Sequence, residues 1–169
     1  PLNSDYKEQM YASVEETMLK AALARTAKYD YGVSREPLSK LDDIVRLSYG
    51  SAQKRRNLER KFREFLQSDA TLAGKQFICQ KLSIVGTEKS VPVLAEMLTN
   101  ESTADMARYA IERIPGTASD EALRNALGKT SGKVKVGIIN SIGQRGDAAA
   151  VVELGGLLSD TADKDAALA

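Results

Sequence analysis

Apolar residues recur at spacings of three and four along almost the whole chain of 169 residues. No segment alternates between apolar and polar positions long enough to form a half-buried strand, so the pattern predicts an all-α protein. Three helices are expected in the first part of the chain, over residues 5–29, 36–49 and 51–67. Gly50 should end the second of them, and Ser68-Asp69 offers an N-cap for the helix that follows.

One side of each of these three helices is apolar and is expected to face the interior. In 5–29 it consists of Tyr6, Met10, Val14, Met18, Ala21 and Ala22. In 36–49 it consists of Leu38, Leu41, Ile44, Val45 and Leu47. In 51–67 it consists of Ala52, Leu58, Phe62, Phe65 and Leu66.

The chain repeats itself from about residue 70 onward. The apolar landmarks align in three sets, with offsets of 29 and 31 residues in each: Leu82, Ile111 and Ile142; Leu94, Leu123 and Leu154; Leu98, Leu127 and Leu158. Each unit has a first helix that ends at a small loop, namely Gly86, Pro115-Gly116, or Gly143 to Gly146. A second helix then starts at Ser90, Ser119 or Asp147 and carries two leucines four residues apart. A period near 30 residues with two helices indicates an α-solenoid.

The last unit also matches a known sequence pattern, through Ile142-Gly143, Gly146-Asp147, Ala150-Val151, Leu154 and Leu157-Leu158-Ser159-Asp160. In these positions the chain resembles the short bacterial HEAT-like repeats first named for phycobilisome lyases. The other two units match in their apolar landmarks only. The arginine frequent early in the family's first helix is replaced by Lys75, Ala104 and Lys135.

The resemblance implies a right-handed α-α superhelix of about three HEAT-like hairpins over residues 68–169. Residues 1–67 would then form an N-terminal helical cap region. The final helix, TADKDAALA, has no closing glycine or cap, so we expect the chain to be a fragment of a longer solenoid or to pair with another element.

The segment Gly143-Gln-Arg-Gly-Asp147 has three interpretations. A phosphate-binding loop follows a strand and carries Lys-Ser/Thr at the next helix start, whereas this segment follows a helix and leads into Ala148. An adhesion tripeptide, Arg145-Gly146-Asp147, is a three-residue match of the kind that arises by chance. A turn between repeats explains the same residues, with Asp147 as the N-cap of the next helix.

The segment KRRNLERKFR, Lys54 to Arg63, contains six basic residues. On a helical wheel, Arg56, Arg60 and Arg63 lie almost opposite the apolar side, which predicts an exposed arginine ridge. Such a ridge suits binding of phosphates or of an acidic partner. A solvated helix face tempered by Glu59 and Glu64 is the alternative, and aromatic residues for base stacking are sparse nearby.

Candidate chemistry is scarce. The chain has no histidine, which excludes Ser-His-Asp, Cys-His and histidine-based zinc sites, and the acidic pairs Asp42-Asp43, Asp120-Glu121 and Glu15-Glu16 diverge by about 100° on a helix. Cys79 lies in an apolar helix segment, which favours a buried thiol over a reactive one. We therefore expect no catalytic residues, no cofactor and no metal site.

Composition and charge limit the classes of function that remain for this chain. The net charge of +1 gives the whole chain no long-range preference for polyanions. No apolar run approaches the roughly 18 residues of a membrane span, and no signal peptide is visible, so the compartment stays open. Tyr6, Tyr11, Tyr29 and Tyr31 either close the first apolar face or line a ligand groove. The sequence predicts a non-catalytic scaffold for a protein partner or flanking domains, with nucleic-acid or acidic-partner binding as the alternative.

Overall fold

The computed structural model describes residues 3–157, and every regular element in this range is helical. The elements are, in chain order, α1 (Ser4–Thr26), α2 (Glu36–Leu47), α3 (Ala52–Leu66), α4 (Leu72–Val85), the 3-10 helix η1 (Glu88–Ser90), α5 (Val91–Met97), α6 (Ala104–Ile111), α7 (Thr117–Leu127), α8 (Gly132–Arg145), the 3-10 helix η2 (Ala148–Ala150) and α9 (Val151–Leu157). The all-α prediction is confirmed for these described residues.

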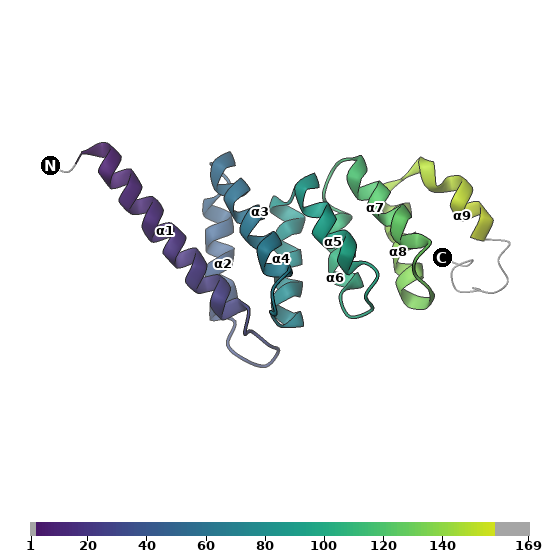
Figure 1. The fold of residues 1–169 in the computed structure, drawn as a ribbon, viewed down its shortest axis with the longest axis horizontal. Coiled ribbons are helices and arrows are strands. Elements are labelled where there is room, and N and C mark those ends of the chain that lie inside the picture. The colour runs from purple at the N-terminus through teal and green to yellow at the C-terminus, as the bar shows by residue number, and fades with distance from the viewer. Residues whose placement is uncertain (1–2, 158–169) are drawn as a thin grey trace.

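The helices follow one another in a row from α1 to α9, as Figure 1 shows. Helices α2, α4, α6 and α8 contact each other in that order and form one layer. Helices α5 and α7 lie side by side in a second layer, and the pairs α3–α4, α5–α6 and α7–α8 pack across the two layers. Helices α2 to α8 therefore bury one side each against elements that are close to them in the sequence.

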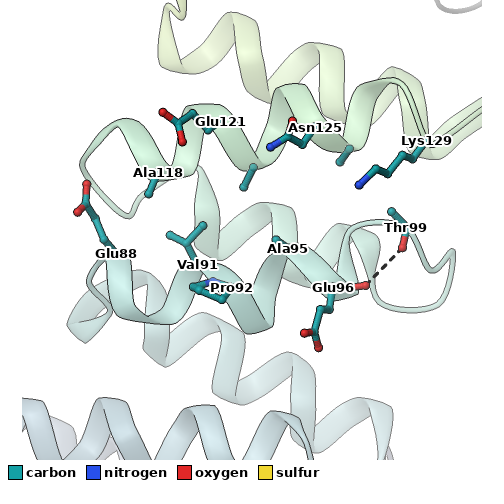
Figure 2. Close-up of a pocket in the computed structure, with 12 residues that line it drawn as sticks. Glu88, Val91, Pro92, Ala95, Glu96, Thr99, Ala118, Glu121, Asn125 and Lys129 are labelled. Atoms are coloured by element: carbon teal, nitrogen blue, oxygen red, sulfur yellow. Dashed lines mark hydrogen bonds between the residues drawn. The ribbon is translucent and has the colours of Figure 1, made fainter.

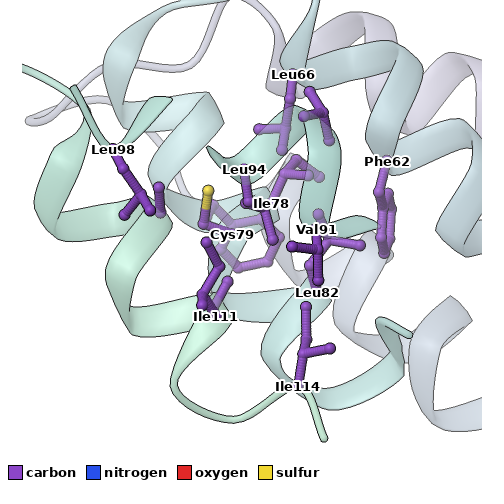
Figure 3. Packing of buried hydrophobic residues seen from close by; sticks show 14 of the residues in the cluster. Phe62, Leu66, Ile78, Cys79, Leu82, Val91, Leu94, Leu98, Ile111 and Ile114 are labelled. Carbon is purple, nitrogen blue, oxygen red and sulfur yellow. The ribbon is translucent and has the colours of Figure 1, made fainter. Parts of the chain in front are cut away.

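One continuous aliphatic core runs through this row (Figure 3). The repeat landmarks that lie fully inside it are Leu82, Ile111, Ile142, Leu94, Leu98, Leu123 and Leu127. Leu154 is half-buried, and Leu158 lies outside the described residues. The predicted interior of the repeats is thus confirmed for the seven buried landmarks.

The loops between paired helices agree with the prediction in part. Helix α4 ends at Gly86, as expected. Gly146 has φ +66°, the left-handed conformation that favours glycine, and it ends α8. The prediction that Gly143 belongs to the loop is wrong, because α8 continues to Arg145. Helix α7 also begins two residues before the predicted Ser119, at Thr117.

The expected apolar side of α1 is largely wrong. Its buried residues are Leu19, Ala22 and Thr26, whereas the residues expected to be buried but found exposed are Tyr6, Met10, Val14, Met18 and Ala21. Only the C-terminal half of α1 lies against the other helices, while its N-terminal half slants away from the row (Figure 1). The first turns of α1 therefore have no described neighbour to cover them.

Three further expectations near the first helices need correction. Leu47 is 71% exposed, because the buried side of α2 follows Leu41 and Val45, and Leu47 lies about 200° beyond Val45 on the wheel. Ala52 is exposed because it is the first residue of α3, at the end of the layer. The N-cap of α4 is Thr71, whose hydroxyl accepts the Gly74 N–H at 3.1 Å, and not Ser68-Asp69.

Candidate functional site

An open groove of about 470 Å³ separates α5 from α7 (Figure 2). Its floor consists of small apolar side chains from both helices: Val91, Ala95, Ala118, Ala122 and Ala126. Three exposed glutamates border it, Glu88 and Glu96 on the α5 side and Glu121 on α7, and the Glu96 carboxylate is turned away from α7 in Figure 2. Lys129 lies at the end of the groove where both helices finish, near Thr99 (Figure 2).

The groove is open because alanines occupy the positions where α5 and α7 face each other. Ala95 and Ala118 are half-buried and pack on the edge of the core. A methyl side chain does not fill the space between two neighbouring helices, whose axes typically lie 8–10 Å apart. The leucines of the same helices, such as Leu94 and Leu123, point into the core instead.

The rim of the groove carries uncompensated negative charge. Within residues 3–157, the side chains of Glu88, Glu96 and Glu121 form no ion pair and no hydrogen bond. Lys129 is the only basic residue in the groove lining. This surface is locally acidic although the chain as a whole has a net charge of +1.

A buried carboxylate joins α3 to the loop between α4 and α5. Oε1 of Glu59 accepts hydrogen bonds from the Thr87 N–H (2.8 Å), the Thr87 hydroxyl (2.7 Å) and the Ser90 hydroxyl (2.8 Å). Ser90 is buried, and its hydroxyl serves this contact and does not cap α5. The alternative interpretation of this segment had Glu59 on a solvated face. That placement is wrong, since Glu59 lies only about 20° beyond Leu66 on the helical wheel, at the edge of the apolar side.

A second polar cluster, which is partly buried, joins α6 to α8. The Ser141 hydroxyl donates to Oε1 of Glu112 at 2.6 Å, and Nη1 of Arg108 donates to the same oxygen at 2.9 Å. Gly137 makes room for this arrangement, because a Cβ there would meet Nε of Arg108 at 3.0 Å. Serine, glutamate and arginine are used here to hold two helices together.

Arg145 of the Arg-Gly-Asp triplet holds the loop between α6 and α7. Its guanidinium donates to the carbonyl oxygens of Ile111, Glu112, Ile114 and Gly116 at 2.9–3.2 Å, and it forms an ion pair with Asp120. Asp147 pairs with Arg124 and caps the following turn by accepting the Ala149 N–H at 3.1 Å. The N-cap prediction for Asp147 is confirmed, and both charged residues of the triplet are engaged within the protein.

The three arginines predicted to form a ridge on α3 differ in their surroundings. Arg56 is exposed and contacts Gln53. Arg60 is exposed and pairs with Glu64 at 2.7 Å. Arg63 is half-buried, and its Nε is buried without a hydrogen-bond partner. Only two of the three expected residues are therefore fully exposed, because burial of Glu59 widens the packed side of α3 toward Arg63.

A second cavity, of about 490 Å³, lies among α1, α2 and α3. Its apolar lining includes Met18, Leu19, Ile44 and Leu58. The ion pair between Glu15 and Lys54 (2.7 Å) crosses from α1 to α3 beside it. Of the four N-terminal tyrosines, Tyr29 is buried and packs edge-on against Tyr31, whereas Tyr6, Tyr11 and Tyr31 are exposed.

Cys79 is fully buried, and its burial raises the pKa of the thiol from 9.0 to about 12, against an opposing effect of Lys75. The expected burial of this thiol is confirmed. In the described range, no group of three or more acidic, cysteine or histidine side chains is placed to hold a metal ion. No helix in that range has both the length and the apolar character to cross a bilayer.

Comparison of this chain with known family models, curated proteins and solved structures finds no match.

Proposed function

We propose that this chain is a non-catalytic protein-interaction scaffold, a HEAT-like helical solenoid of about three hairpins over residues 68–169 with an N-terminal helical cap over residues 1–67. The observation that carries the proposal is the groove between α5 and α7. It combines an apolar floor with charged rims that have no partner within residues 3–157. A surface of this kind suits a polypeptide segment, whose apolar side chains meet the floor while its polar groups meet the rim.

The polar clusters support a non-catalytic role. Glu59, Glu112 and Arg145 each use their charged atoms to hold a loop or a neighbouring helix. Their hydrogen-bonding capacity serves the fold and is not directed toward the groove. The absence of histidine from the sequence removes the commonest acid and base near neutral pH.

Affinity capture from the chain's native cell extract tests the proposal. The wild-type chain is compared with Ala95→Gln, which places a longer side chain on the groove floor. We expect a discrete protein to be retained by the wild type and lost from Ala95→Gln, with both chains showing the same helical circular dichroism. Equal retention by both, or no specific protein on either, would contradict the proposal.

Binding of nucleic acid or another polyanion through the α3 arginines is the second candidate. Arg56 favours it because its guanidinium is exposed and pairs with no carboxylate in the described residues. The pair between Arg60 and Glu64 and the partial burial of Arg63 make it weaker than the groove proposal. A genuine site would bind DNA or RNA with an affinity that falls steeply with salt and would lose it when Arg56, Arg60 and Arg63 become Glu. No measurable affinity at low salt would end this candidate.

A further inference from the structure

We propose that the groove between α5 and α7 takes an extended, basic polypeptide segment with two Lys or Arg residues about four positions apart and small apolar residues between them. This inference rests on the proposed scaffold function and names the chemistry of its partner. It follows from the length, the alanine-rich floor and the charge of the groove.

The length of the groove sets the length of the segment. Its α5 side runs from Glu88 to Thr99, which corresponds to about 17 Å at 1.5 Å per helical residue. An extended chain rises about 3.3 Å per residue, so about five residues cover this length. The alanine floor leaves depth for small side chains such as Ala, Val or Ser, because the cavity of about 470 Å³ is distributed along the whole groove.

The glutamates set the charge and the spacing of the partner. Glu88 and Glu96 lie on the same rim eight residues apart, or about 12–14 Å along the helix. In an extended segment this distance corresponds to about four residues. Glu121 stands on the opposite rim near the Glu88 end (Figure 2). Two cationic side chains at this spacing would neutralise carboxylates that have no partner of their own in the described part of the chain.

Lys129 gives the partner a direction. It is the basic residue in the groove lining and lies where α5 and α7 end, opposite the end that holds Glu88 and Glu121 (Figure 2). Charge complementarity therefore places the more basic end of the segment near Glu88 and Glu121, and a carboxylate or a neutral end near Lys129.

The test selects from a displayed library of random 12-residue peptides on the immobilised full chain, with counter-selection on Ala95→Gln. Enriched peptides should carry two Lys or Arg residues three to five positions apart. Their affinity should fall at least tenfold in the triple variant Glu88→Gln, Glu96→Gln and Glu121→Gln. The matched control, Glu8→Gln, Asp69→Asn and Glu153→Gln, removes the same charge away from the groove and should change the affinity less than twofold.

The outcomes separate this inference from the proposed function. Neutral or acidic peptides that bind the wild type but not Ala95→Gln would overturn the basic segment and leave the groove as a binding site. Peptides that bind Ala95→Gln as tightly as the wild type would contradict both. Failure to enrich any peptide would overturn the basic-segment inference. Self-association of the chain that the triple Gln variant abolishes would also overturn it, because the occupant of the groove would then be a second copy of the chain.

Discussion

The carboxylate of Glu59 and the hydroxyl of Ser90 lie 2.8 Å apart in the interior, although 31 residues separate them in the chain. The same oxygen also accepts from the backbone and side chain of Thr87. Helix α3 is thereby fixed to the loop between α4 and α5. A change at this contact should therefore affect the packing of all three helices.

Glu59→Ala should lower the free energy of unfolding by about 3 kcal/mol, because the buried Ser90 hydroxyl and the two part-buried donors of Thr87 lose their acceptor. Urea unfolding followed by circular dichroism measures this change. Glu64→Ala on the same helix is the control, since it breaks an exposed pair with Arg60 and should cost less than about 1 kcal/mol. Similar losses in the two variants would show that Glu59 is not held as the structure has it.

Leu98→Asp should lower the free energy of unfolding by about 4 kcal/mol or more, because it buries an unpaired charge at a position with 0% exposure. The matched substitution Leu47→Asp lies at a residue that is 71% exposed and should change stability by about 0.5 kcal/mol or less. Thermal melting of both variants provides the comparison. Near-normal melting of Leu98→Asp would mean that the second helix of the first repeat does not face the core.

Arg145→Lys should destabilise the protein although it keeps the positive charge, because a lysine side chain cannot reach four carbonyl oxygens and a carboxylate at once. We expect a loss of about 2 kcal/mol and faster hydrogen exchange in the loop between α6 and α7. Arg46→Lys, at an exposed pair with Asp43, is the control and should leave both measurements nearly unchanged. Unchanged exchange at residues 112–117 in Arg145→Lys would contradict this role.

The thiol of Cys79 should resist modification in the folded protein at pH 8 and react rapidly in urea, because it is buried and protonated. Its pKa of about 12 in the folded state exceeds its ordinary 9.0, so the unfolded chain releases this proton at lower pH than the folded chain. The stabilising effect is complete below pH 9 and is lost as the pH rises from 9 to 12, at up to about 1.4 kcal/mol per pH unit.

Comparison of wild type with Cys79→Ala isolates this effect from the titration of tyrosines and lysines. The difference in unfolding free energy between the two should be constant up to about pH 9 and then shrink. A difference that stays constant up to pH 12, or rapid labelling of the folded thiol, would contradict the buried site.

The sequence predicted the interior of the repeats well because one physical rule governs it. Leucines at i and i+4, as in Leu94 and Leu98, lie on one side of a helix and are buried against whatever packs there. The same rule was wrong for Met10, since apolar spacing does not tell which part of a helix has a neighbour. The error at Leu47 is different, because its position on the wheel already lies away from Leu41 and Val45.

The candidate site was not predictable in the same way. In the sequence, Ala95 and Ala118 are ordinary helix-forming residues. They form the floor of a groove only because α5 and α7 pack side by side. The buried position of Glu59 had a signal, its place close to Leu66 on the helical wheel, but its partners lie about 30 residues away. The basic segment of α3 can be recognised in the sequence. The ion pair between Arg60 and Glu64 cannot, because it depends on the rotamers of both side chains.

Site-specific photo-crosslinking in native extract tests the scaffold account most directly. A photoreactive residue replaces Asn125, on the rim of the groove, or Asn140, an exposed residue of α8, in otherwise identical chains. The account predicts one discrete crosslinked protein from position 125 and none from position 140. Crosslinks of equal intensity from both positions, or none from position 125, would contradict a partner-binding groove between α5 and α7.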